Sequence, residues 1–355
     1  MKKILLVLLT FGMLCGCQGK KEDECLKIAV IFPLTGHTGA AMANNVKNAL
    51  TMCADSLNKA GGINNQIIEM KFYDCRNADP KEGVSIARRL VAVDKPQIVI
   101  SMISPVVINT NPIFEEHKIL NLAVCQSSNL LVESTNYTLR THISTNQTGH
   151  AIATSIVKDF GKKEVKVLYA NTEFGQASLA SFKQAADELG LVYSITSFEE
   201  RDLSYRNYIL KANLDSNDLL YTIGIQESLG KLIRECRNLG FNGNIIGGPD
   251  INSFLAIKNM GEQRQNIFYI KTSRGPQFED FDNRYISTYG ESMDEIAVLC
   301  CNGFLTVMNC MQELDDNDID KFMQRIKSYK GNSLMGTTYF INNEMVFDSE
   351  IARLK

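Results

Sequence analysis

The sequence lacks the short motifs that mark common catalytic sites. It contains no G-x-S-x-G nucleophile elbow, no H-E-x-x-H zinc motif, no Walker A loop and no G-x-G-x-x-G dinucleotide fingerprint. The four histidines, His37, His117, His142 and His150, do not have the spacing of metal ligands. These absences favour a protein that is not an enzyme and that carries no metal or cofactor. The alternative left open is an acid/base pair of carboxylates that only the fold brings together.

Basic stretches and long apolar stretches are also missing. The formal net charge is −3 and the isoelectric point is about 5.9. Nucleic-acid-binding domains commonly have a pI above ~9 and a clustered basic face, so the sequence argues against that class. The apolar run at residues 4–14 is far shorter than the ~20 residues of a membrane-spanning helix.

Cysteine is present, but never as C-x-x-C, which argues against a redox or zinc module. Eight of the ten cysteines follow the N-terminal segment: Cys25, Cys53, Cys75, Cys125, Cys236, Cys300, Cys301 and Cys310. Most have apolar neighbours, where a free cysteine packs as a small apolar residue. Cys53 with Cys75 is the candidate disulfide, although spacing alone does not give the connectivity.

The N-terminus reads as a secretory signal. Lys2 and Lys3 precede the apolar run, which ends at Leu14-Cys15-Gly16-Cys17. These last four residues resemble the bacterial lipobox, in which cleavage precedes a cysteine that then carries lipid. We expect a signal peptide at 1–16 and a lipidated tether at 17–25, with Cys17 as the lipid attachment residue. An ordinary signal followed by a chance cysteine is the alternative.

Strand and helix patterns alternate through the rest of the chain. Strands are predicted at 26–32, 67–73, 97–102, 120–124, 165–170, 192–198, 219–223, 245–246 and 267–271. Helices are predicted at 43–60, 80–92, 106–116, 149–160, 175–188, 205–216, 228–239, 278–289, 296–313 and 319–328. Such alternation is typical of parallel sheets covered by helices on both faces. A chain of 355 residues is long for one core, so we expect an α/β protein with two doubly wound lobes.

Small polar residues follow several predicted strands. Ser104 comes after the third strand, Ser127 after the strand ending at Val124, and Asp250 after a Gly-Gly-Pro turn. In open α/β sheets, ligands bind outside the carboxyl ends of the strands. Hydroxyls at helix starts suit an anion and a lone carboxylate suits an ammonium. Routine helix capping and turn formation explain the same residues equally well.

Several segments resemble the type 1 periplasmic binding proteins, and most closely their branched-chain amino-acid group. The resemblance rests on the Phe-Pro-Leu-Thr-Gly of residues 32–36, the Ala-Gly-Gly-Ile-Asn of residues 60–64, and weaker matches through Gly175 to Asp250. It implies two lobes that close on a ligand through a three-segment hinge. By position, the three crossing segments between the lobes fall near residues 143–147, 272–276 and 331–336. One lobe then takes 26–144 plus 275–331 and the other takes 145–274 plus 332–355.

The resemblance also implies site residues. The serine that meets the ligand amino group falls on Ser104, the carboxylate-binding segment on Cys125, Gln126 and Ser127, the facing aromatic on Phe174, and the carboxylate that pairs with the ammonium on Asp250. The family usually has glutamate at the last position. Two aromatic positions fall on Ala41 and Gln226, so we expect the amino-acid head to be retained while the side-chain pocket is rebuilt.

The expected function is capture of a small amino-acid-like ligand for delivery to an ABC permease. The protein is then a monomeric lipoprotein on the periplasmic or cell-surface side of a bacterial membrane, without nucleic-acid partners. The alternative is a ligand-sensing receptor subunit for a signalling partner, because the same class of fold serves in extracellular receptors.

Overall fold

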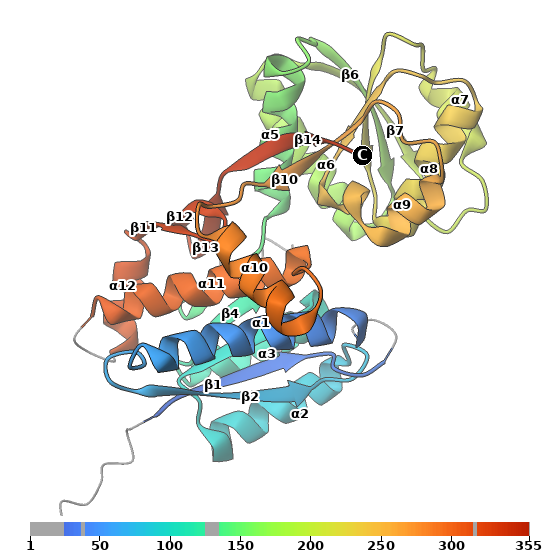
Figure 1. The fold of residues 1–355 in the computed structure, drawn as a ribbon. Coiled ribbons are helices and arrows are strands. Elements are labelled where there is room, and N and C mark those ends of the chain that lie inside the picture. The colour runs from blue at the N-terminus through green and yellow to red at the C-terminus, as the bar shows by residue number, and fades with distance from the viewer. Residues whose placement is uncertain (1–24, 37–39, 125–134, 315–317, 355) are drawn as a thin grey trace, which may run out of the picture.

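The structure is a computed structural model that describes residues 25–36, 40–124, 135–314 and 318–354. The described strands form two separate sheets, each at the centre of an α/β lobe (Figure 1). The N-terminal strands lie in one lobe, and the segment after residue 145 forms most of the other. The two-lobed α/β fold expected from the sequence is therefore confirmed.

The first lobe contains a sheet with the order β11-β12-β13-β5-β4-β3-β1-β2. Its strands are β1 (Cys25–Phe32), β2 (Ile67–Asp74), β3 (Ile98–Met102), β4 (Leu120–Val124), β5 (Thr138–Arg140), β11 (Lys330–Ser333), β12 (Gly336–Ile341) and β13 (Glu344–Phe347). Its helices are α1 (Ala40–Lys59), α2 (Pro80–Arg89) with a π-helical turn at Leu90–Asp94, α3 (Ser104–Glu116), α10 (Phe278–Tyr289), α11 (Glu295–Gln312) and α12 (Ile319–Ile326).

Strand β1 is buried on both faces, which explains its nearly continuous apolar sequence. Alternate residues point to opposite faces of a strand. Val30 and Phe32 join the core formed with α1 and α11, whereas Ala29 and Ile31 join the core under α2 and α3. Helices therefore cover both faces of this sheet (Figure 1), as parallel sheets require.

The second lobe repeats this plan with the sheet order β14-β10-β9-β8-β6-β7. Its strands are β6 (Glu164–Ala170), β7 (Val192–Phe198), β8 (Leu219–Ile223), β9 (Asn244–Gly247), β10 (Ile267–Thr272) and β14 (Ser349–Arg353). Its helices are α5 (Thr145–Lys158), α6 (Glu173–Glu188), α7 (Arg206–Ala212), α8 (Gln226–Asn238), a 3-10 turn at Pro249–Asn252 and α9 (Phe254–Met260). Helices α5 and α6 cover one face, and α7, α8 and α9 the other.

The last part of the chain differs from the sequence expectation. Strands β11, β12 and β13 pair antiparallel with one another at the edge of the first sheet, and only β14 joins the second sheet. The last crossing between sheets is therefore at Asp348, not at residues 331–336, and the second-lobe segment expected at 332–355 is wrong over β12 and β13. Short antiparallel strands lack the helical spacer that marks parallel strands in a sequence.

The cysteines of the described residues are all free, and the candidate disulfide between Cys53 and Cys75 is wrong. Cys53 lies in the core between α1 and α11, close to Cys301. Cys75 lies in the core on the opposite face of the sheet. Both thiols are buried and pack as small apolar groups, which confirms for these two residues the prediction that free cysteines lie in the apolar core.

Among the helices that the structure describes, none is long and apolar enough to span a membrane. Cys17 and the signal segment lie outside the described residues.

Candidate functional site

A cavity of about 360 Å³ lies beside the crossing segments, lined by both lobes. Most of its wall comes from the second lobe, and α11 of the first lobe closes one side. Its lining residues are His142, Ile143, Ser144, Thr145, Thr148, Phe174, Ser178, Tyr221, Thr222, Ile223, Gly224, Gly248, Pro249, Asp250, Asn252, Ser253, Tyr269, Lys271, Thr272, Arg274, Glu295, Ile296 and Leu299. The volume and the mixture of aromatic and polar groups are those of a small-molecule site. We call it the cleft cavity.

Strand direction explains why residues distant in sequence meet in the cleft cavity. Phe174 follows β6, Gly224 follows β8 and Asp250 follows β9, and these strands are parallel neighbours in the second sheet. Their carboxyl ends therefore lie at the same edge, which is where α/β sheets bind ligands.

Asp250 is the carboxylate at the end of β9, within the turn Pro249–Asn252. Burial raises its pKa to about 6, the nearby Glu200 contributes in the same direction, and a hydrogen bond to backbone opposes them. Within the described part of the chain, no cation is paired with Asp250. A partly buried carboxylate whose pKa is raised in this way is stabilised in its charged form when a cation arrives.

Phe174 follows the carboxyl end of β6 and is the second residue of α6. The Thr172 hydroxyl accepts a hydrogen bond from the Gly175 amide at 3.1 Å and caps the helix. A Cβ at Gly175 would lie 1.9 Å from the Ala170 carbonyl oxygen, so only glycine allows this close turn. The turn places the Phe174 ring in the cavity wall.

Ser104 lies in the first lobe, as the first residue of α3, and does not line the cleft cavity. The preceding Ile103 has φ +72°, a left-handed conformation that is a strained outlier for a β-branched residue. Its amide donates to the Val124 carbonyl at 3.2 Å, which fixes this strained turn beside the end of β4. Strain that the surroundings enforce is common at ligand sites.

The remaining predicted positions are less fully described. Cys125, Gln126 and Ser127 lie outside the described residues, directly after the end of β4. Gln226 is the first residue of α8, two positions after Gly224 of the cavity wall. The structure thus brings Phe174 and Asp250 to one cavity, and places Ser104 in the other lobe.

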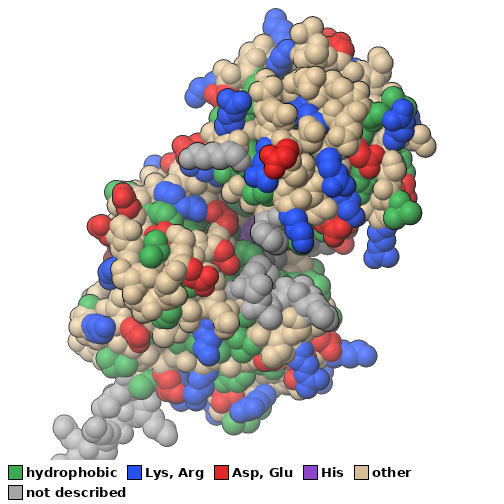
Figure 2. Space-filling view, turned by 45° about the vertical axis from the view of Figure 1, so that its right-hand side comes forward, with side chains coloured by type: hydrophobic (Ala, Val, Ile, Leu, Met, Phe, Trp, Pro, Cys, Tyr) green, Lys and Arg blue, Asp and Glu red, His purple; other side chains and the backbone are tan. Residues whose placement is uncertain are grey.

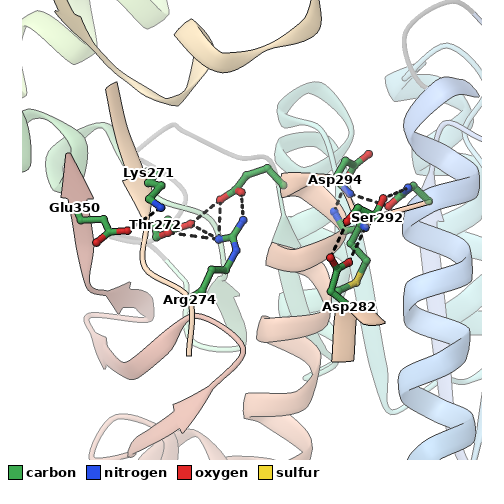
Figure 3. A network of polar contacts seen from close by, with 11 residues as sticks. Lys271, Thr272, Arg274, Asp282, Ser292, Asp294 and Glu350 are labelled. Atoms are coloured by element: carbon green, nitrogen blue, oxygen red, sulfur yellow. Dashed lines mark hydrogen bonds and ion pairs between the residues drawn. The ribbon is translucent and has the colours of Figure 1, made fainter. Parts of the chain in front are cut away.

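Sequence reasoning missed the charged residues that the crossing segments add. Thr272 donates to the Glu295 carboxylate at 2.6 Å, and Arg274 donates to the Thr272 hydroxyl at 2.9 Å and forms an ion pair with Glu295 (Figure 3). Lys271 forms an ion pair with Glu350 at 2.8 Å. The only sequence signal that could have identified these charged residues was their position, since the second crossing segment was expected at 272–276.

His142 also lines the cavity without having been predicted there. Burial lowers the pKa of its imidazole, so the ring is neutral at neutral pH. Its Nδ1 lies 2.8 Å from the Ile143 carbonyl oxygen, which orients the ring. Among the residues that the structure describes, no cluster of three or more His, Cys, Asp or Glu side chains could hold a metal ion.

Two α/β lobes with a cavity of mixed apolar and polar lining beside their crossing segments define a two-lobed ligand-binding protein. The chain belongs to the periplasmic binding protein family, whose model matches residues 26–355. This match and the relatives below confirm the resemblance to the type 1 proteins of the branched-chain amino-acid group.

The chain is similar to Leu/Ile/Val-binding protein homolog 3 of Brucella melitensis, with 25% identity over 231 residues, 64% of this chain. The match spans 62% of that relative's own length.

Two solved structures show the same fold at 18% identity, each with a TM-score of 0.76. One is the branched-chain amino-acid transporter substrate-binding protein LivJ from Streptococcus pneumoniae in complex with isoleucine, covering 93% of this chain and 96% of that one. The other is a solute-binding protein of an ABC transporter from Rhodopseudomonas palustris in complex with 3,4-dihydroxybenzoic acid, covering 94% of each chain.

Proposed function

We propose that this protein is an extracytoplasmic solute-binding lipoprotein that captures a small amino-acid-like ligand between its lobes and delivers it to an ABC permease. The observation that carries the proposal is Asp250, a partly buried carboxylate with a raised pKa and without a cationic partner in the described residues, in one cavity with Phe174. The ligand's ammonium supplies the missing cation.

The carboxylate end of the ligand is assigned to the first lobe. Ser104 begins α3 directly after the end of β3, and Cys125, Gln126 and Ser127 follow the neighbouring strand β4. Binding both ends of one ligand joins the lobes, so the proposal includes closure of the cleft on the ligand.

The structural neighbours frame the choice of ligand class. The S. pneumoniae protein binds isoleucine and the R. palustris protein binds 3,4-dihydroxybenzoic acid. Both ligands have a carboxyl group, but only isoleucine has an ammonium. Asp250 would repel an acid that lacks one, and it therefore favours the amino-acid class for this chain.

Lipidation at Cys17 completes the proposal. Residues 18–24 are polar and link that cysteine to β1, so the lipid would restrict a monomeric binding protein to the membrane that contains its permease. Restriction of this kind raises the effective concentration of receptor at its partner. Mass spectrometry of the membrane-extracted protein tests this part: a diacyl modification is expected on wild-type protein and absent in Cys17→Ala.

A thermal-shift screen of amino acids and of acids without an ammonium tests the ligand class. A ligand at 100 times its dissociation constant adds about 2.7 kcal/mol to the free energy of unfolding. We expect a shift with amino acids that Asp250→Asn abolishes. A shift with acids lacking an ammonium, and none with amino acids, contradicts the proposal.

The sensing alternative shares the same binding step. It is distinguished by labelled-ligand uptake in cells with and without the protein: loss of uptake supports delivery to a permease, and unchanged uptake with a changed transcriptional response supports sensing.

A further inference from the structure

The wall of the cleft cavity contains a second charged feature besides Asp250, and it comes from the other side of the lobe boundary. Arg274 and Glu295 form an ion pair that lines the cavity, with side chains 30% and 41% exposed. Arg274 follows β10 on a crossing segment and Glu295 begins α11, so the pair joins the second crossing to the first lobe. We call it the front pair.

The guanidinium of the front pair is fixed on several sides. Arg274 donates to the Thr272 hydroxyl at 2.9 Å, and its Cζ lies 4.8 Å from the Phe278 ring centroid. Thr272 in turn donates to Glu295 at 2.6 Å. A guanidinium that is stacked and bonded in this way presents its remaining N–H groups in fixed directions.

The carboxylate is equally well positioned, because the start of α11 is anchored. Asp294 caps the helix by accepting from the Ala297 amide at 2.7 Å, and its own amide donates to the Asn45 side chain at 3.0 Å (Figure 3). Asp282 accepts from the Ser292 hydroxyl at 2.6 Å and from the Met293 amide at 3.0 Å. The carboxylate of Glu295 is therefore a preorganised acceptor next to a preorganised donor.

The charges of the cavity limit what this corner can bind. Arg274 and Glu295 neutralise one another, and Lys271 is paired with Glu350. A ligand side chain with a charge of either sign would be buried without a countercharge, which is costly. An aliphatic side chain would cover the front pair and remove water from it without replacing the lost hydrogen bonds, which is also unfavourable.

We propose that the ligand is an amino acid with an uncharged polar side chain, a carboxamide or a hydroxyl, which accepts from Arg274 and donates to Glu295. The proposal rests on the proposed function, since Asp250 must first bind the ligand's ammonium. It assigns side-chain specificity to the front pair, in the corner of the cavity formed by the second crossing and α11.

Amino acids of matched shape test the proposal without any mutation. Asparagine, leucine and aspartate have side chains of nearly equal size that are neutral polar, apolar and anionic, and threonine and valine form a second matched set. Binding is measured calorimetrically on protein that has been unfolded, dialysed and refolded to remove carried-over ligand. We expect the neutral polar member to bind at least about tenfold more tightly than its isosteres in each set that binds.

Three variants assign that preference to the front pair. In Glu295→Gln, Arg274 loses its counter-ion, so aspartate should gain affinity relative to asparagine. Arg274→Gln leaves the carboxylate alone and should shift the ratio the opposite way. The double change Arg274→Met with Glu295→Met should favour leucine. Arg325→Met with Glu313→Met removes a similarly exposed Arg–Glu pair between α11 and α12, away from the cavity, and should leave all ratios unchanged.

The outcomes separate this inference from the proposed function. Leucine, valine or aspartate binding as tightly as the neutral polar isostere overturns the inference, while the proposed function stands. No binding of any amino acid overturns both. Unchanged ligand ratios in all three front-pair variants overturn the role of Arg274 and Glu295.

Discussion

The two sides of the hinge contain the same chemistry in different surroundings. At the front, Arg274 and Glu295 form a partly exposed ion pair in the wall of the cleft cavity. At the back, Arg140 on β5 forms an ion pair with Glu344 on β13, with side chains only 1% and 15% exposed. Gln147 of α5 donates to Glu344 at 2.7 Å and to the Met345 carbonyl at 2.9 Å, so this buried group also connects the lobes.

The cavities on the two sides differ as well. The back cavity has about 840 Å³, more than twice the volume of the cleft cavity, and includes Arg140 and Glu344 in its wall. Strand β10 separates them, because Ile270 faces the back while Tyr269 and Lys271 face the front. The volume of a cavity therefore does not identify the ligand site. The front cavity has the strand ends and a carboxylate without a paired cation in the described residues, whereas the back cavity has an ion pair satisfied within the protein. Figure 2 shows the hollow between the lobes.

The largest expected effect is on stability, from the back of the hinge. Glu344→Gln removes the countercharge of a buried Arg140, and breaking a buried pair costs about 3–5 kcal/mol. Urea denaturation should show this loss in the free energy of unfolding. The matched change Glu295→Gln at the front should cost about 1 kcal/mol or less, since exposed pairs contribute little. Equal losses in the free energy of unfolding for the two variants would contradict the distinction between a stabilising ion pair at the back of the hinge and a ligand-binding pair at the front.

The next largest effect is on affinity, from the front. Asp250→Asn removes the charge that meets the ligand's ammonium and should weaken binding about 100-fold or more. Calorimetric titration with the tightest amino-acid ligand measures it. Unliganded Asp250→Asn should be at least as stable as wild type at pH 7.5, because burial disfavours the ionised carboxylate. A variant that binds normally would exclude Asp250 from the site.

A third prediction concerns the turn that positions Phe174. Gly175→Ala places a methyl group against the Ala170 carbonyl, so the start of α6 must shift, at a cost of about 1–3 kcal/mol. Ligand affinity should fall together with the thermal midpoint. Gly248→Ala is the control for stability, because its added methyl would lie 3.5 Å from Thr148, an ordinary contact. Equal thermal midpoints for the two variants would contradict the steric argument.

The smallest predicted effect is the pH dependence of binding. The folded-state pKa of Asp250, about 6, lies above the ordinary 3.8, and only the ionised carboxylate pairs with an ammonium. Affinity should therefore be full above pH 7 and fall as the pH drops through 6, by up to about tenfold per unit below it. Titrations at pH 5, 6, 7 and 8 measure this, and Asp250→Asn should show a flat profile. The same shift means that any stability from the neutral form is present below pH 4 and lost as the pH rises through 6.

The elements themselves were largely predictable from the sequence. The apolar runs at β1, β3, β4 and β8 are buried on both faces, and periodic helices with Gly or Asn after them gave nearly correct bounds. The short helix α9 was missed, and so were the short strands β5 and β11–β14, because the pairing of these strands depends on residues far away in the chain. Register and partner choice in such strands are decided by tertiary contacts.

By itself, the sequence determined the two-lobed α/β architecture, the family and two residues of the cavity wall, Phe174 and Asp250. Those two follow from strand direction, since parallel strands end at one edge. Only the tertiary structure decided the charge environment: that Asp250 is partly buried without a paired cation in the described residues, that Arg274 meets Glu295 in the cleft cavity, and that Arg140 is buried behind the hinge. The physical reason is that burial and charge pairing depend on which distant segments share a surface, and residues 140, 274, 295 and 344 become neighbours only where the chain crosses between the sheets.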